Sequence, residues 1–114
     1  MSGPDVSVVT ACLPTASDHL REAAESGGAV RARGVDVEWI LVFDGPETVT
    51  PPEAASVVLT LPRRRGVAAA RNYGLSAARA PFLACLDADD ELVAEGVLAG
   101  LQRLRTDDTV GWVA

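Results

Sequence analysis

One run of nine residues, 35–43, restricts most strongly what this 114-residue chain can fold into. The run begins with apolar and acidic residues in alternation, and from Trp39 to Phe43 every side chain is apolar. A strand with water on one face keeps the alternation to its end, whereas a strand covered on both faces is apolar throughout. The run therefore predicts a strand that enters a sheet covered on both faces.

Further apolar runs alternate with helical segments along the rest of the chain. Strands are expected at 6–10, 56–61, 82–86 and from 110 onward, and helices at about 18–26, 67–79 and 92–105. Gly27 and Gly28 are expected to end the first helix. The second helix is expected to turn Val67, Ala70, Gly74, Leu75 and Ala78 inward, with Gly74 allowing a close approach to the sheet. This alternation predicts an α/β fold, with a mostly parallel sheet and helices on both faces.

The composition indicates a single globular domain, with 48% apolar and 23% charged residues. The net charge of −6 argues against nucleic acid as a partner. The sequence shows neither a signal peptide nor an apolar run near the roughly 18 residues of a membrane span, so a cytoplasmic location is expected. Cys12 and Cys85 lie in or near apolar runs and are expected to be buried, reduced thiols. His19 is the only histidine, which leaves a zinc site almost without ligands.

Three carboxylates, Asp87, Asp89 and Asp90, follow the apolar run at 82–86. Neighbouring carboxylates repel one another, so their grouping at a strand end favours a bound cation. Mg²⁺ and Mn²⁺ are the usual cations where carboxylates and substrate phosphates share a site. A solvated turn or a helix N-cap is the alternative. An EF-hand calcium loop is excluded, because it requires glycine and glutamate at positions that Leu92 and Leu98 occupy here.

Asp44 follows the second expected strand as Asp87 follows the fourth. The carboxyl ends of parallel strands lie at the same edge of a sheet, and ligands bind at that edge where the strand order reverses. The two carboxylates are therefore predicted to converge on one metal–diphosphate site.

The order of elements and three motifs resemble the family 2 glycosyltransferases of the GT-A fold. The motifs are the Asp44-Gly45 turn and the segments 66–75 and 86–90. The resemblance covers essentially the whole chain and implies a Rossmann-like GT-A sheet that is truncated. Residues 1–114 would form the N-terminal nucleotide-sugar-binding part. The implied reaction transfers a sugar, with inversion, from a nucleotide sugar that is usually UDP-linked to an acceptor of unknown identity.

The resemblance also implies roles for individual residues. Asp44 matches an aspartate that typically binds the nucleotide base. Ala11 and Leu13 lie where the family places nucleotide-binding residues after the first strand, but they lack the family's aromatic side chain. Arg71 matches an arginine that faces the nucleotide, with a solvated helix arginine as the alternative. The charge run at 63–65 is interpreted as a solvated loop, with an approach to the phosphates as the alternative.

The acidic segment matches the family's Asp-x-Asp region, where one carboxylate contacts the ribose and another holds Mn²⁺ or Mg²⁺. Asp87 and Asp89 are the candidates for nucleotide binding, and Asp87, Asp89 and Asp90 for the metal; which of them is the direct ligand stays open. No residue matches the family's general base, which is expected beyond Ala114.

The missing base leaves two interpretations, a donor-binding fragment of an enzyme or a non-catalytic nucleotide-binding or scaffold domain. An apolar surface exposed where the sheet is cut off would favour a homo-oligomer. A phosphohydrolase with an aspartate nucleophile is disfavoured, because all ten basic residues are arginine and such enzymes usually need a lysine.

Overall fold

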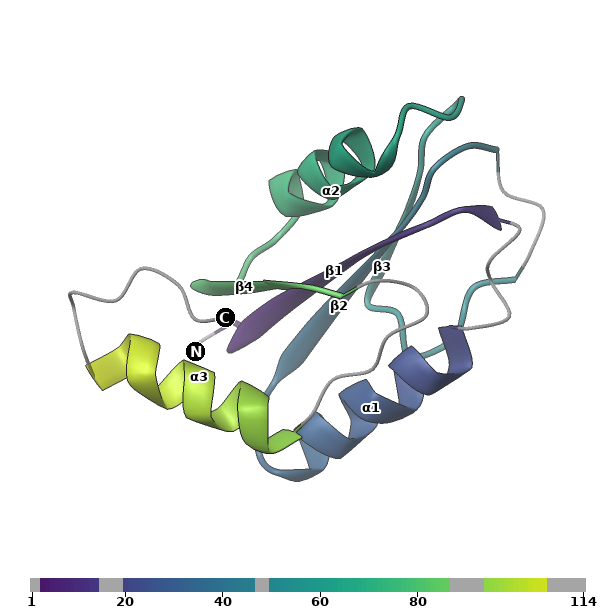
Figure 1. Ribbon diagram of the computed structural model, residues 1–114. Helices are drawn as coiled ribbons and strands as arrows, with labels where there is room; N and C mark the ends of the chain where they lie inside the picture. Colours follow the sequence, from purple (N-terminus) through teal and green to yellow (C-terminus); the bar gives the residue numbers. More distant parts are fainter. Residues whose placement is uncertain (1–2, 15–19, 47–49, 87–93, 107–114) are drawn as a thin grey trace.

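The computed structural model describes residues 3–14, 20–46, 50–86 and 94–106, and Figure 1 shows how they are arranged. Within these residues, seven elements follow one another: β1 (Val6–Cys12), α1 (Leu20–Ala32), β2 (Val37–Phe43), β3 (Val57–Thr60), α2 (Val67–Ser76), β4 (Phe82–Cys85) and α3 (Ala94–Thr106). The strand expected from residue 110 lies outside the described residues. The expected alternation of strands and helices is confirmed.

The four strands form one sheet in the order β3-β2-β1-β4, and all neighbouring strands are parallel. The chain moves outward from β1 through β2 to β3 and then crosses to the other side of β1 to form β4. The strand order therefore reverses between β1 and β4. In open parallel sheets, this reversal is the point beside which ligands bind.

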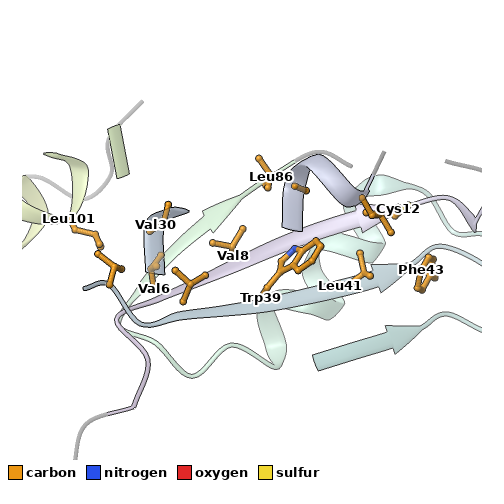
Figure 2. Packing of buried hydrophobic residues seen from close by; sticks show 13 residues of the cluster. Val6, Val8, Cys12, Val30, Trp39, Leu41, Phe43, Leu86 and Leu101 are labelled. Atoms are coloured by element: carbon orange, nitrogen blue, oxygen red, sulfur yellow. The ribbon is translucent and has the colours of Figure 1, made fainter. Parts of the chain in front are cut away.

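Helices cover both faces of the sheet, as predicted. α1 and α3 lie together on one face, and α2 lies on the other face over β1 and β2 (Figure 1). On the α1 and α3 side, Val8, Trp39 and Leu41 point into the main core (Figure 2). A smaller core on the α2 side consists of Val9, Ile40, Val42, Leu61 and Ala70. Every position of β2 is buried, which accounts for the continuous apolar end of its sequence.

Gly74 brings α2 very close to the sheet. A Cβ atom added at this residue would lie 2.5 Å from Cγ1 of Val9 and 3.0 Å from Cγ2 of Val42. Carbon atoms make favourable contacts at about 3.5–4.0 Å, so no other residue fits here without movement. The close approach predicted from the sequence is confirmed.

The prediction that Gly27 and Gly28 end the first helix is wrong. α1 continues to Ala32, and its end is followed by Gly34, whose φ of 88° is typical of the glycine that ends a helix. Each glycine inside the helix costs about 1 kcal/mol relative to alanine. Packing of the buried face of α1, including Val30, against the sheet outweighs that cost.

The second helix begins at Val67 as predicted, but the exposure of its first residue and the position of its end differ from the prediction. Val67 was expected to face inward, but its side chain is 51% exposed at the first turn, while Ala70 and Gly74 are buried as expected. The helix ends at Ser76 rather than near Arg79. The reason lies in a buried carboxylate that binds the chain just after the helix.

Glu38 is this carboxylate, and it is 2% exposed. It lies on β2 opposite Ser7 of β1, and the Ser7 hydroxyl donates to Oε1 of Glu38 at 2.8 Å. The backbone N–H of Arg79 donates to Oε1 at 3.0 Å, and Nε of Arg79 donates to Oε2 at 2.6 Å. The N–H of Ala80 donates to the Ser7 hydroxyl at 3.1 Å. These four hydrogen bonds hold the connection that leads from α2 into β4.

Acidification is expected to weaken this connection. Burial raises the pKa of Glu38, but hydrogen bonds from Arg79 and Ser7 and the charge of Arg79 outweigh it, so the pKa lies below its usual 4.5. A lowered pKa in the folded state contributes stability that is present above pH 4.5 and lost as the pH falls through the folded value.

Arg79→Ala should therefore lower the free energy of unfolding by about 1 kcal/mol at pH 7, a modest figure because water screens this 70% exposed side chain. Urea unfolding should show the difference from wild type shrinking as the pH falls below 4.5 and through the lowered pKa of Glu38, because a protonated Glu38 no longer attracts the charge of Arg79. Arg21→Ala is the control, since it removes an exposed pair with Glu25 that is worth less than about 0.5 kcal/mol. A difference that stays constant as the pH is lowered from 7 until the wild-type protein unfolds would contradict the role of this pair.

Candidate functional site

Asp44 lies directly after β2, at the carboxyl edge of the sheet. Its side chain is only 6% exposed, and its backbone N–H donates to the carbonyl of Cys12 at the end of β1 at 2.8 Å. Its carboxylate accepts the backbone N–H of Arg65 on Oδ1 at 2.7 Å and that of Gly66 on Oδ2 at 3.0 Å. Both oxygens therefore bind the connection between β3 and α2.

Two glycines let this connection lie against the end of β2. Gly66 precedes α2 with a φ of 98°, and Gly45 follows Asp44 with a φ of 125°. Residues with a side chain rarely adopt either value. A Cβ atom on Gly45 would lie 3.7 Å from the backbone nitrogen of Arg64, so the two turns lie close together. The turn predicted at Asp44-Gly45 is therefore present, and it supports a second loop.

That second loop carries three consecutive exposed arginines, Arg63, Arg64 and Arg65. Within the described part of the chain, no carboxylate forms an ion pair with any of them. The first turn of α2, which follows directly, contains no acidic residue, and Gly66 has no side chain to cap it. The described residues in this part of the carboxyl edge therefore carry a positive charge, although the chain as a whole carries −6.

The end of β4 lies at the same edge, on the other side of β1. Leu86 is buried, and its N–H donates to the carbonyl of Val9 at 2.9 Å. Asp87, Asp89 and Asp90 lie outside the described residues, so their expected convergence with Asp44 stays a prediction. Among the described residues, no group of three His, Cys, Asp or Glu side chains is placed to hold a metal ion.

The other predicted nucleotide-binding residues lie on two elements. Ala11 is half-buried near the end of β1, and Leu13 follows that strand, so both lie at the carboxyl edge with Asp44. Arg71 lies in α2, one residue after the buried Ala70, and is half-buried. The structure thus brings Ala11, Leu13 and Asp44 to one edge, whereas the contact of each with a nucleotide stays a prediction.

The two cysteines differ in their surroundings. Cys12 is buried, and its thiol donates to the carbonyl of Leu13 at 3.0 Å. Burial raises the pKa of this thiol to about 11, so it is neutral near pH 7 and a poor nucleophile or metal ligand. Cys85 was expected to be buried, but it is exposed. Cys85 and Leu83 lie on the same face of β4. α2 packs on β1 and β2, so it leaves this face of β4 uncovered.

Two carboxylate roles were missed by the sequence analysis. Glu38 interrupts a run that becomes fully apolar one residue later, and this interruption was the available signal for a buried, partnered carboxylate. The hydrogen bonds of Asp44 to Arg65 and Gly66 had no comparable signal, because they join segments that are 21 and 22 residues apart. None of the helices in the described ranges is both long enough and apolar enough to cross a membrane.

Comparisons with known proteins agree with this architecture. The family model described as "Glycosyl transferase family 2" matches residues 13–114. The succinoglycan biosynthesis protein ExoO of Rhizobium meliloti (strain 1021) is 39% identical over an alignment of 93 residues, which covers 76% of this chain and 26% of that protein. The crystal structure of S. aureus TarS 1-349 superposes with a TM-score of 0.67 at 18% identity, over 83% of this chain and 30% of that one. The chain therefore spans about a quarter of the length of the curated relative.

Proposed function

The chain belongs to glycosyl transferase family 2, and from this membership we propose that it binds a nucleotide-sugar donor at the carboxyl edge of its GT-A sheet. The proposed donor is a UDP-sugar, and the proposed reaction transfers its sugar to an acceptor with inversion at the anomeric carbon. The acceptor and the general base are not assigned to described residues. The proposal therefore concerns the donor half of the reaction.

The observation that carries this proposal is the reversal of strand order between β1 and β4. Asp44 lies at the carboxyl edge on one side of β1, and Leu86, the residue before Asp87, lies on the other side. Ligands of open parallel sheets bind outside this edge at such a reversal. The sequence motifs and the topology both support a donor site at this position.

The proposed nucleotide-binding residues are Ala11, Leu13, Asp44, Arg71, Asp87 and Asp89, and the proposed metal ligands are Asp87, Asp89 and Asp90. Carboxylate oxygens are the ligands that Mg²⁺ and Mn²⁺ prefer, so the donor set fits such an ion. A divalent ion bound there would supply positive charge beside the diphosphate of the leaving nucleotide. The described residues would contribute by orienting the nucleotide at the sheet edge.

Two further features support finer parts of the proposal. Both cysteines are free thiols, which supports a location in the reducing cytoplasm. Leu83 is 53% exposed on β4, which lies at the edge of the sheet that the described strands form, and this exposure supports self-association of the chain through β4.

Calorimetric titration of the chain with UDP, GDP and dTDP, each with and without Mn²⁺, tests the proposed function. We expect UDP to bind more tightly than the other two, and Mn²⁺ to strengthen its binding. Circular dichroism verifies that the titrated chain is folded. A folded chain that binds none of the three nucleotides would contradict the donor site, and Mn²⁺-independent binding would contradict the metal. Tight binding without sugar transfer in the presence of acceptors would favour a nucleotide-binding or scaffold domain instead.

A further inference from the structure

We propose that Glu38 and Ser7 are positioning residues for the donor site. Together they fix the register of β4 against β1, and thereby the place at the carboxyl edge where the segment 87–90 begins. This inference rests on the proposed function, which assigns the metal ligands to that segment. Neither residue lies at the donor site itself, because each is the second residue of its strand, at the amino edge of the sheet. Both act on the metal through β4.

The apolar pattern of β4 does not select a single register. The strand has four residues, of which Leu83 and Cys85 are exposed and Phe82 and Ala84 are half-buried. A shift of the strand by one residue would exchange its two faces, whereas a shift by two residues would keep them. Alternate residues from 80 to 88 are all apolar, so a shift by two residues in either direction would still place an apolar side chain at every inward position. Another interaction must therefore set the register.

Glu38 and Ser7 provide this interaction by binding two successive peptide groups just before β4. The N–H of Arg79 donates to Oε1 of Glu38 at 3.0 Å, and the N–H of Ala80 donates to the Ser7 hydroxyl at 3.1 Å. The Ser7 hydroxyl in turn donates to Oε1 of Glu38 at 2.8 Å, which fixes the two acceptors relative to each other. Both acceptors lie on inner strands of the described sheet, so they form a rigid reference for the chain that enters β4. We call these two side chains and the two N–H groups the register clamp.

A shift of β4 by two residues in either direction would break the register clamp. In one direction, Pro81 would take the place of Arg79, and proline has no N–H to donate. In the other direction, the N–H groups of residues 77 and 78 would be needed, but these already donate to carbonyls in the last turn of α2 at 3.0 and 3.2 Å. Either shift would deprive the carboxylate of Glu38 of donors while it is 2% exposed, which is unfavourable. The clamp therefore permits only the observed register.

The register of β4 sets where the proposed metal ligands begin relative to the nucleotide. The N–H of Leu86, the residue before Asp87, donates to the carbonyl of Val9 at 2.9 Å, and the N–H of Asp44 donates to the carbonyl of Cys12 at 2.8 Å. Both strand ends are thus referenced to β1. A shift by two residues would move Leu86 by about 6.6 Å along β1. Metal–oxygen bonds of about 2.0–2.1 Å do not tolerate such a displacement. Loss of the clamp should therefore weaken the contribution of the metal and not that of the base contact.

The test compares UDP binding with and without Mn²⁺ in a variant that lacks the clamp. Ser7→Ala with Glu38→Leu removes both acceptors and leaves no charge buried without a partner. The factor by which Mn²⁺ strengthens UDP binding should fall about ten-fold, the lower end of the loss seen when a residue that orients a metal ligand is removed. Binding without Mn²⁺ should not change. Calorimetry measures both affinities, and nuclear Overhauser contacts between the backbones of Val8 and Ala84, which are partners in the sheet, report the register directly.

Two further variants separate an effect on register from a general loss of stability. Thr10→Val removes the buried hydrogen bond from Nε1 of Trp39 to Oγ1 of Thr10 at 2.9 Å, which joins the same two strands, and neither residue pairs with β4. This variant should be less stable than wild type but should keep the Mn²⁺ effect and the contacts between β1 and β4. Glu38→Gln keeps an oxygen for the Ser7 hydroxyl and the Arg79 N–H, so it should retain most of the Mn²⁺ effect.

Ser7→Ala alone serves if the double variant does not fold. It removes the acceptor of the Ala80 N–H and leaves Glu38 bound to Arg79, so it should produce the same changes to a smaller extent.

The outcomes separate this inference from the proposed function. An unchanged Mn²⁺ effect or unchanged contacts between Val8 and Ala84 in the folded clamp variants would overturn the inference while the donor site stands. An equal fall of the Mn²⁺ effect in Thr10→Val would also overturn it, because lost stability would then be the cause. Wild-type binding of UDP that does not depend on Mn²⁺ would overturn the metal site together with this inference. A folded wild-type chain that binds no nucleotide would contradict the proposed function itself.

Discussion

Replacing Gly74 with alanine is expected to lower the free energy of unfolding by about 2 kcal/mol. The new Cβ would lie 2.5 Å from Cγ1 of Val9 and 3.0 Å from Cγ2 of Val42, and both valines are fully buried and stiff about χ1. Overpacking of this kind costs up to about 3 kcal/mol, and the better helix propensity of alanine returns about 1 kcal/mol. Urea denaturation of Gly74→Ala and wild type, monitored by circular dichroism, measures the difference.

A matched control is available in α1. Gly28 is also a helical glycine, but a Cβ added there meets no atom within 4 Å. Gly28→Ala should therefore raise the free energy of unfolding by about 0.5–1 kcal/mol, in the opposite direction to Gly74→Ala.

The steric cause is tested by making room in the sheet. In a Val9→Ala background, Gly74→Ala should cost less than in wild type, because the nearer of the two methyl contacts is gone. An equal cost in both backgrounds, or stabilisation by Gly74→Ala alone, would show that the helix does not need its close approach to the sheet.

The double substitution Asp89→Asn with Asp90→Asn is expected to weaken Mn²⁺-dependent UDP binding by more than about 100-fold. Loss of a residue that only supports a metal ligand already lowers metal affinity by about 10–100-fold. The effect should be larger here, because Asp89 and Asp90 are proposed to be ligands themselves. The asparagines remove two negative charges and keep the size of the side chains. Calorimetry with UDP and Mn²⁺ measures the loss, and the circular dichroism spectrum should not change.

Asp107→Asn with Asp108→Asn provides the matched control, since it changes the charge of the chain by the same amount in another adjacent acidic pair. This control should retain the binding of the wild-type chain. If the Asp89 and Asp90 variant bound UDP with undiminished dependence on Mn²⁺, the assignment of the metal site to this segment would be wrong.

The sequence by itself determined the architecture of this protein. A strand that is apolar on both sides, as in the second half of 35–43, can only lie between two covering layers, and β2 is indeed buried at every position. Gly74 was identified correctly as a point of close approach to the sheet. A glycine inside a helix destabilises that helix relative to alanine, and close packing against a neighbouring element is a physical reason for its presence. The spacing of apolar residues and the helix propensity of a residue depend only on residues that are neighbours in the sequence, so both can be predicted from the sequence alone.

Only the tertiary structure decided where α1 ends and how the buried carboxylates are satisfied. The packing of α1 on the sheet overrides two local helix breakers at Gly27 and Gly28, and Glu38 ends α2 early by binding Arg79. Asp44 holds a loop 21 residues away, a pairing that depends on which strands become neighbours. Such hydrogen bonds form between segments that folding brings together, so a local pattern can indicate a buried carboxylate, as at Glu38, but does not encode its partners.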